Sequence, residues 1–354
     1  MSDAFDAGRL LAPECPVPAE PGDRVTLAHG AGTGAAWRLF EELLFPRLAN
    51  EWLAPRHDGA VLDAEGARLA FTADSFVVRP LEFPGGDIGS LAVHGTLNDL
   101  AMCGARPLAL SCALVLEEGL PLATLARIVD SLGAAARAAG VPVATGDTKV
   151  VERGKGDGLY VSTAGVGLVP PGRVLSPERV APGDVVLVSG PIGAHGAAVL
   201  SAREGLAVES GIRSDSAWLG PLVAAALAAA PGLRCLRDPT RGGLGAALHE
   251  IARGAGCEIE LEEAALPVDP PVRAVCELFG LDPLFLASEG RCVVFAAEED
   301  AERALAALRA EPLGRQAARI GRVRAGAPRV VVATAFGGRR LLVLPAGDPL
   351  PRIC

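Results

Sequence analysis

The sequence predicts two domains that each mix helices with strands, followed by an extended tail. A chain of 354 residues is longer than one hydrophobic core usually absorbs. Strand-like and helix-like segments alternate on both sides of a connector at residues 170–184 that is rich in Pro and Gly. Residues 345–352 contain 3 prolines, which exclude a regular helix or an inner strand there.

The first domain, residues 37–170, begins with a predicted helix at 37–52 that Pro46 interrupts or kinks. A second helix opens with Asp87 as its N-cap and ends near Gly104. Apolar spacing of three and four residues predicts a third helix at 123–140, which Gly140 ends. The predicted strands are 60–62, 68–72, 75–78, 108–116, 141–151 and 159–169.

The second domain, residues 180–335, repeats this alternation. Its predicted strands are 185–190, 257–261, 292–297, 318–323 and 329–334, and its predicted helices are 196–204, 218–230 and 244–253. A glycine-rich arm at 1–36 precedes the two domains, and a mobile tail at 336–354 follows them.

Composition excludes several classes of protein. The net charge is −9 with no Lys/Arg-rich run, which argues against a nucleic-acid partner. The N-terminus lacks a secretory signal, and the apolar run at 222–230 is too short to cross a membrane, so we expect a cytoplasmic protein. The 8 cysteines include no CxxC pair, and 5 lie in apolar patterns that predict reduced, buried thiols.

Aspartates in turns beside strand ends are the first candidate site. Carboxylates on separate loops can hold Mg²⁺ against phosphate, whereas any single one can equally serve as a turn or cap residue. Asp87 and Asp99 share a predicted helix and lie about 18 Å apart at 1.5 Å per residue, so they cannot ligate the same ion. The set is Asp58, Asp74, Asp99, Asp147 and Asp238.

Two further features are the glycine-rich segment and the last residue. Residues 29–34, HGAGTG, can offer backbone N–H groups to a phosphate, or can simply form a flexible arm. Cys354 ends the chain after Pro351 and Arg352, and it is either a carrier thiol or an incidental terminal cysteine. A cysteine in the last position does not fit the prenylation motif.

The sequence resembles the HypE family of hydrogenase maturation factors over nearly its whole length. NDLAMCGARP and GDT also occur in the wider superfamily of aminoimidazole ribonucleotide synthetase, thiamine-monophosphate kinase and selenophosphate synthetase. FPGGDIG, DPTRGG and the terminal PRIC narrow the resemblance to HypE. One departure is the early segment from Gly30 to Gly34, which is looser than the family's Gly-x-Gly-Gly and leaves backbone amides as the groups that could contact a nucleotide.

The resemblance implies a two-domain α+β fold like aminoimidazole ribonucleotide synthetase with a flexible C-terminal tail. It also implies a homodimer formed through the first domain's strands, with ATP and Mg²⁺ between the domains. The implied metal ligands are Asp74, Asp99, Asp147 and Asp238. The implied nucleotide-binding residues are Asp58, Asp74, Asp87, Asn98, Asp99, Asp147, Thr148, Asp238, Gly30 and Gly32.

The implied activity is carried by Cys354. A HypF-type carbamoyltransferase loads its thiol, ATP-dependent dehydration gives a thiocyanate, and cyanide passes to iron on a HypC–HypD complex for [NiFe]-hydrogenase. Phosphorylating the carbamoyl oxygen would make it a good leaving group. We expect Glu289 to be the base, or else a surface residue, and Lys149 to neutralise phosphate charge.

Other interpretations stay open from the sequence. His94 and His195 are weaker catalytic candidates, since a single His on a helix is usually structural. The chain could instead be a synthetase or kinase of the same superfamily that acts on a free small molecule. It could also be a non-catalytic scaffold whose tail is a docking peptide.

Overall fold

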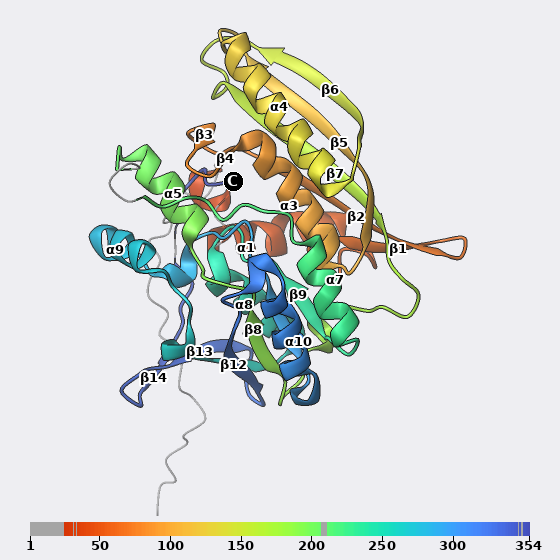
Figure 1. Ribbon diagram of the computed structural model, residues 1–354, viewed down its shortest axis with the longest axis vertical. Helices are drawn as coiled ribbons and strands as arrows, with labels where there is room; N and C mark the ends of the chain where they lie inside the picture. Colours follow the sequence, from red (N-terminus) through yellow and green to blue (C-terminus); the bar gives the residue numbers. More distant parts are fainter. Residues whose placement is uncertain (1–24, 31, 33, 207–210, 346, 348–349) are drawn as a thin grey trace, which may run out of the picture.

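The computed structural model describes residues 25–30, 32, 34–206, 211–345, 347 and 350–354. The first 24 residues of the predicted arm, Ala31, Thr33 and three positions of the tail therefore lie outside the described residues. Figure 1 shows an upper half made of β1 to β7 with α3 and α4, above a lower half built around β8 to β14. The two-domain α+β prediction is confirmed.

The N-terminal helix is irregular around Pro46, as predicted. It consists of α1 (Gly34–Arg38), a π-helical turn η2 (Leu39–Leu44) and α2 (Phe45–Leu48), after a 3₁₀ turn η1 (Leu27–Gly30). The backbone N–H of Phe45 reaches back five residues to Phe40. Pro46 has no N–H and its ring crowds the preceding turn, which favours this wider winding. The helix ends at Leu48, four residues before the predicted end.

A five-stranded sheet forms the first domain, in the order β1-β2-β7-β5-β6. Its members are β1 (Ala60–Ala64), β2 (Ala67–Phe76), β5 (Arg106–Glu117), β6 (Val143–Val151) and β7 (Leu159–Leu168). The two segments predicted at 68–72 and 75–78 merge into β2. Among the described strands of this sheet, only β5 and β6 pair in parallel, through the crossover helix α4 (Leu122–Ala139). Eight of the nine residues of β6 are exposed.

Helix α3 (Ile88–Met102) packs against β2, β7 and α4. Asp87 caps it, as predicted, by accepting hydrogen bonds from the N–H groups of Gly89 and Ser90. A short hairpin, β3 (Glu82–Phe83) with β4 (Gly86–Asp87), leads into this helix. Gly104 follows the helix with φ of +68°, a conformation that favours glycine.

A seven-stranded sheet forms the second domain, in the order β14-β13-β10-β12-β8-β11-β9. All four residues of β8 are fully buried because helices cover both faces. Val185 and Leu187 join the cluster of α7 and α10, whereas Val186 and Val188 join that of α8. The strands are β8 (Val185–Val188), β9 (Cys235–Arg237), β10 (Glu258–Glu262), β11 (Val293–Ala296), β12 (Ala318–Arg324), β13 (Arg329–Ala333) and β14 (Arg339–Leu341).

The helices of this domain include two that sequence reasoning missed, α9 and α10. The α-helices are α5 (Ala194–Arg203), α7 (Gly220–Ala229), α8 (Gly243–Ala255), α9 (Pro270–Phe279) and α10 (Glu298–Ala310). The 3₁₀ turns are η3 (Pro177–Arg179), η4 (Glu263–Ala265), η5 (Pro283–Phe285) and η6 (Pro312–Gly314). No helix among the described residues is long and apolar enough to cross a membrane.

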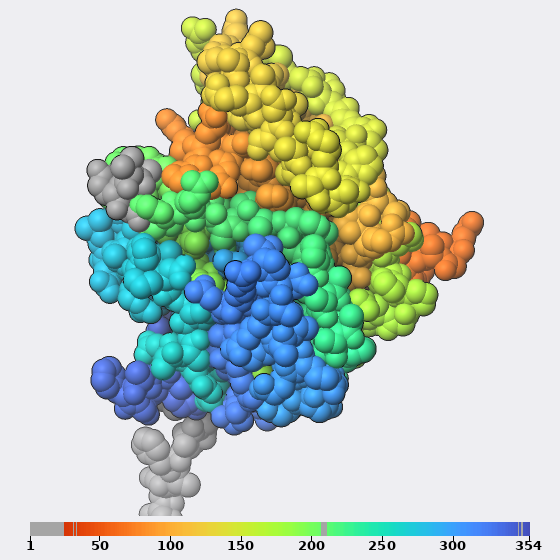
Figure 2. Space-filling view, viewed as in Figure 1, coloured from red at the N-terminus to blue at the C-terminus, as the bar shows by residue number. Residues whose placement is uncertain are grey.

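The end of the tail is packed between the two domains, although the sequence predicts a mobile arm. Leu350 and Ile353 are buried in one cluster with α3, α5 and α9. Figure 1 places the C-terminus between α5 and the β3–β4 hairpin, and Figure 2 shows the first domain seated directly on the second. The other cysteines that the structure describes are free, and all but the half-buried Cys112 are buried, as predicted.

Candidate active site

Three aspartates from separate parts of the chain converge where the two domains meet. Asp58 precedes β1, Asp99 lies on α3 and Asp238 follows β9. Each offers one oxygen, and these oxygens all lie within 4.8 Å of one another. Thr72 donates a hydrogen bond of 2.6 Å to Asp99, and Arg237 pairs with Asp58 at 2.5 Å. Hard oxygen ligands at this spacing suit a divalent cation such as Mg²⁺.

The electrostatics of this carboxylate cluster also fit a cation. Burial, together with repulsion among the carboxylates, raises the pKa of Asp99 and of Asp238 well above the usual range. Burial likewise raises the pKa of the nearby Asp74. The buried Oδ2 of Asp58 has no hydrogen-bond partner among the described residues. A bound divalent cation would satisfy that oxygen and relieve the repulsion.

Asp147, Thr148 and Lys149 lie elsewhere in the same chain. They belong to the exposed edge strand β6, where Lys149 pairs with Asp147 at 2.6 Å. In the strand register, Asp147 on β6 lies beside Ala113 on β5. Ala113 lies beside Ser162 on β7, which in turn lies beside Ser75 on β2. Three interstrand steps of about 4.8 Å make roughly 14 Å, too far for Asp147 to share an ion with the cluster.

Two other predicted nucleotide-binding residues have structural partners. Asp87 is engaged as the cap of α3. Asn98 is buried and ties the domains together: its Nδ2 donates to the carbonyl oxygens of Ala217 and Glu289, and its Oδ1 accepts from the N–H of Leu219. Neither side chain is free to meet a ligand in this arrangement.

Cys354 lies beside Glu289 and Arg241. Burial raises the pKa of its thiol well above the usual value; the Glu289 carboxyl, which hydrogen-bonds the thiol, raises it further, and Arg241 partly offsets this. Cys354 is in turn the largest influence that raises the pKa of Arg241. Arg352, two residues before Cys354, pairs with Asp157.

Glu289 is buried, which excludes its interpretation as a surface residue. Its side chain is only 2% exposed, and its Oε1 has no hydrogen-bond partner among the described residues. Burial, and repulsion from Asp238, Asp215 and Asp74, raise the pKa of this carboxyl well above its usual range. A carboxyl with a raised pKa next to a thiol is suited to exchanging protons near neutral pH.

Two cavities meet at Arg241. A cavity of about 220 Å³ is lined by the tail residues Arg352 to Cys354, by Gly30 and by Arg241. A larger pocket of about 810 Å³ lies between the N-terminal helix and α8, and Arg241, His57 and Gly32 are part of its wall. Gly32 adopts φ of +67° and packs so closely on the Arg241 backbone that a Cβ would lie 2.7 Å from its carbonyl oxygen.

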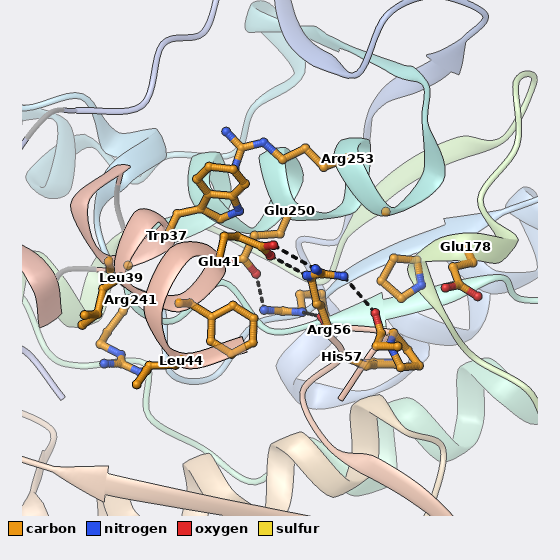
Figure 3. Close-up of a pocket in the computed structure, with 18 of the residues that line it drawn as sticks. Trp37, Leu39, Glu41, Leu44, Arg56, His57, Glu178, Arg241, Glu250 and Arg253 are labelled. Atoms are coloured by element: carbon orange, nitrogen blue, oxygen red, sulfur yellow. Dashed lines mark hydrogen bonds and ion pairs between the residues drawn. The ribbon is translucent and has the colours of Figure 1, made fainter. Parts of the chain in front are cut away.

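Figure 3 shows residues that line the larger pocket. The guanidinium of Arg253 stacks over the ring of Trp37, 4.2 Å from its centre. Arg56 forms a two-pronged pair with Glu41 across the pocket, with contacts of 2.5 and 2.9 Å. An aromatic ring and several arginines in one pocket suit the base and the phosphates of a nucleotide.

Both candidate histidines are held by other residues. His94 bonds Ser216, and burial lowers its pKa to about 4. His195 is fully buried between Ser214 and the backbone carbonyl of Ile353, and burial lowers its pKa as well. The structural interpretation therefore holds for both side chains.

Known proteins match this chain over nearly its whole length. The models for the N-terminal and C-terminal domains of AIR synthase related proteins match residues 56–169 and 181–333. Carbamoyl dehydratase HypE from Azotobacter vinelandii is 56% identical over 331 residues, which cover 93% of this chain and 97% of that protein. The chain belongs to the HypE family.

Solved HypE structures share the fold. One HypE in complex with ATP matches with a TM-score of 0.79 at 46% identity, covering 93% of this chain and 100% of that one. A chain from a HypE–HypF complex matches with a TM-score of 0.83 at 43% identity, covering 87% and 99%. The family resemblance expected from the sequence motifs is thus confirmed.

Sequence reasoning about this HypE family member missed the basic residues of the site. Arg237 and Arg241 flank Asp238 in the RDPTRGG turn, and both face the carboxylate cluster. The signal was present, because Arg241 belongs to the DPTRGG motif that identified the family and Arg237 directly precedes it. Trp37 and Arg253 carried no comparable signal, since they come together only through packing of the N-terminal helix on α8.

Proposed function

We propose that this chain is an ATP-dependent carbamoyl dehydratase that converts a carbamoyl group on Cys354 into a thiocyanate. The cyanide formed would serve the iron of [NiFe]-hydrogenase during maturation. The observation that carries this proposal is the position of the Cys354 thiol, enclosed between domains beside Glu289 and Arg241. HypE relatives are named carbamoyl dehydratases, and one has been solved with ATP.

We assign ATP to the larger pocket, with its base near Trp37 and its phosphates toward Arg241 and the carboxylate cluster. The walls of this pocket and of the thiol cavity share Arg241, so a nucleotide there can reach a group on Cys354. Asp58, Asp99 and Asp238 would hold Mg²⁺, with Asp74 beside them; the ion supplies positive charge for phosphoryl transfer.

Glu289 would then remove protons from the carbamoyl nitrogen. The two N–H protons must leave as the oxygen departs with phosphate, because only then can the carbon–nitrogen triple bond form. Glu289 contacts the thiol that carries the group, and the raised pKa of its carboxyl favours uptake of a proton. Arg241 provides positive charge beside the same atoms.

We further propose a homodimer in which β6 meets a second copy. Asp147 and Lys149 are exposed on this strand and lie too far from the cluster of their own chain. A dimer formed through the strands of the first domain would allow Asp147, Thr148 and Lys149 to serve the other copy's nucleotide. We retain 37–170 and 180–335 as the domain bounds in this arrangement.

The partners follow from the chemistry of the tail. A HypF-type carbamoyltransferase would load Cys354 when the tail is outside, and a HypC–HypD complex would receive the cyanide. A relative's structure is of a HypE–HypF complex, which supports the first partner. The packed tail disfavours an enzyme for free metabolites, since residues 350–354 fill the space between the domains.

Intact-mass analysis of the full chain tests this proposal. Incubation with the carbamoyltransferase, carbamoyl phosphate and ATP should add about 43 Da at Cys354, falling to about 25 Da once Mg-ATP reacts. A C354A control should stay unmodified. Turnover of a free metabolite by unmodified wild-type protein would instead establish the small-molecule synthetase.

A further inference from the structure

Each of the last four residues is held by its backbone carbonyl. The carbonyl oxygens of Pro351 and Arg352 accept hydrogen bonds of 2.8 and 2.7 Å from the guanidinium of Arg203. That of Ile353 lies 2.7 Å from Nε2 of His195. The backbone N–H of Val77 donates to Cys354, and that of Arg79 donates to Arg352. The chain terminus therefore has a donor from the protein body at every carbonyl.

One helix supplies both side chains that bond the carbonyl oxygens of the tail. We call these two residues, His195 and Arg203, the tail clamp. His195 lies in the first turn of α5 and Arg203 is its last residue, which places them about 12 Å apart along the axis. The helix between them is buried and rich in alanine, and it packs with Leu350 and Ile353. Segment 77–79 of the first domain also bonds the tail, so groups from both domains hold it.

Arg203 also bonds the segment 77–79 of the first domain. Its Nε and Nη2 donate to the carbonyl oxygen of Arg79 at 3.0 and 2.8 Å. A guanidinium has five donors in a rigid planar fork, so one side chain can hold the tail and the 77–79 segment at fixed separation. Lysine, with a compact ammonium, could not reproduce that geometry.

The contact of His195 defines its tautomer. A carbonyl oxygen only accepts, so Nε2 must carry the proton that bonds Ile353. Burial lowers the pKa of this imidazole, which keeps it neutral, so Nδ1 accepts from the Ser214 hydroxyl 2.8 Å away. The only titratable or charged group besides the tail that acts appreciably on His195 among the described residues is Asp215.

We infer that His195 and Arg203 are positioning residues that hold the C-terminal tail in the active site. They do so through hydrogen bonds to backbone atoms of the tail alone. This rests on the proposed role of Cys354 as carrier. Because none of these bonds involves the thiol, the clamp holds the tail equally whether the sulfur carries a proton, a carbamoyl group or a cyano group. The same inserted position can thus serve each stage of the dehydration.

The test measures insertion without any dehydration chemistry. A polymer-linked maleimide too large for the 220 Å³ cavity should label Cys354 only when the tail is out. Peptide mapping isolates this thiol from the others. We expect R203A and H195A to increase the initial labelling rate of Cys354 about tenfold in the full chain, as for loss of one or two strong hydrogen bonds.

Conservative variants and a matched control distinguish a loss of tail positioning from a general loss of protein stability. H195Q keeps a donor near the position of Nε2 and should label close to the wild-type rate, whereas R203K should resemble R203A. R309A removes an arginine of α10 that bonds the carbonyl oxygen of Ala317 far from the tail, and it should leave Cys354 labelling unchanged.

A double-mutant cycle tests whether misfolding, rather than loss of the tail contacts, explains faster labelling of Cys354. Deleting residues 350–354 should remove most of the effect of H195A on thermal stability, because the carbonyl oxygen of Ile353 is gone, and should reduce the effect of R203A, whose bonds to Arg79 remain. Unchanged Cys354 labelling in both alanine variants would overturn the inference, as would undiminished stability losses in the truncated chain. Failure of the carbamoyltransferase to modify Cys354 would refute only the proposed function, since labelling needs no carrier chemistry.

Discussion

The thiol of Cys354 contacts the carboxyl of Glu289, and burial raises the pKa of both groups well above their usual values. The two groups thus share one poorly solvated space, in which each disfavours the charged form of the other. A group attached to the sulfur would stand directly against this carboxyl. We therefore propose that Glu289 acts in the dehydration step and not in loading of the tail.

Replacing Glu289 with glutamine should separate those two steps. E289Q keeps the shape of the side chain and removes the base, so we expect dehydration to slow by about 10²-fold or more. Intact mass should then show the carbamoyl adduct accumulating with little conversion to the cyano form. E277Q, an exposed change on α9, is the control. Conversion at the wild-type rate in E289Q would assign the base to another residue.

Much of the site could be predicted from the sequence because the motif residues mark it. The order of strands and helices followed from apolar periodicity, and Asp99 and Asp238 meet as expected. Glu289 was singled out only from its place before a strand, and its burial could not be foreseen. Helix α10 was missed because its polar, alanine-rich sequence carries a weak apolar stripe.

The failures concern contacts between segments distant in sequence. The prolines in the tail correctly excluded regular structure, but carbonyl hydrogen bonds to Arg203 and His195 hold the tail without it. Arg352 stands two residues before Cys354, yet it has a positive φ of 61° and its side chain pairs with Asp157. Periodicity and spacing contain no information on such pairings.

Mg²⁺ should stabilise the protein more strongly as the pH rises. The pKa values of Asp74, Asp99 and Asp238 are raised in the folded state, so their contribution to stability is fully present below the unfolded value near 4. It is lost as the pH rises through the folded pKa values, and a cation restores it. Thermal melts with and without MgCl₂ between pH 5 and 8 measure this difference.

The variant D99N tests whether the carboxylate cluster causes the pH-dependent stabilisation by Mg²⁺. Removing one carboxylate relieves repulsion, so the protein without Mg²⁺ should melt a few degrees higher. Each kcal/mol added to the free energy of unfolding raises the melting temperature by about 2–4 °C. The added stability from Mg²⁺ should largely disappear. D147N, on the exposed strand β6, is a matched control and should keep the wild-type response to Mg²⁺ when nucleotide is absent. Equal responses in D99N and wild type would exclude this cation site.

Trp37 should contribute to nucleotide binding through stacking. Its ring lines the larger pocket with Arg253 over one face. Stacking of a base on an aromatic side chain is worth about 1–3 kcal/mol, so W37A should weaken ATP binding by roughly tenfold. Calorimetry with a non-hydrolysable ATP analogue measures this. W52A is the control, because Trp52 is exposed and lies outside the lining residues; comparable losses in both variants would contradict our assignment.

Mixing two inactive variants should reveal whether Asp147 acts across a dimer. D147N and D99N should each abolish most dehydration, since each lacks a carboxylate of the composite site. If Asp147 serves the other copy, a mixed dimer has one site with both defects and one intact site. After subunit exchange at equal concentrations, half of the dimers are mixed, so about a quarter of wild-type activity should return.

The same mixture distinguishes the alternative of a site completed within one chain. In that case every site in a mixed dimer keeps one defect, and activity should stay at the level of the parent variants. D147N mixed with D147N-D99N is the negative control, because no intact site can form in either arrangement. Crosslinking through a cysteine introduced on β6 should confirm that exchange has occurred. Activity at the parental level despite demonstrated exchange would remove Asp147 from the shared site and leave it as the exposed partner of Lys149.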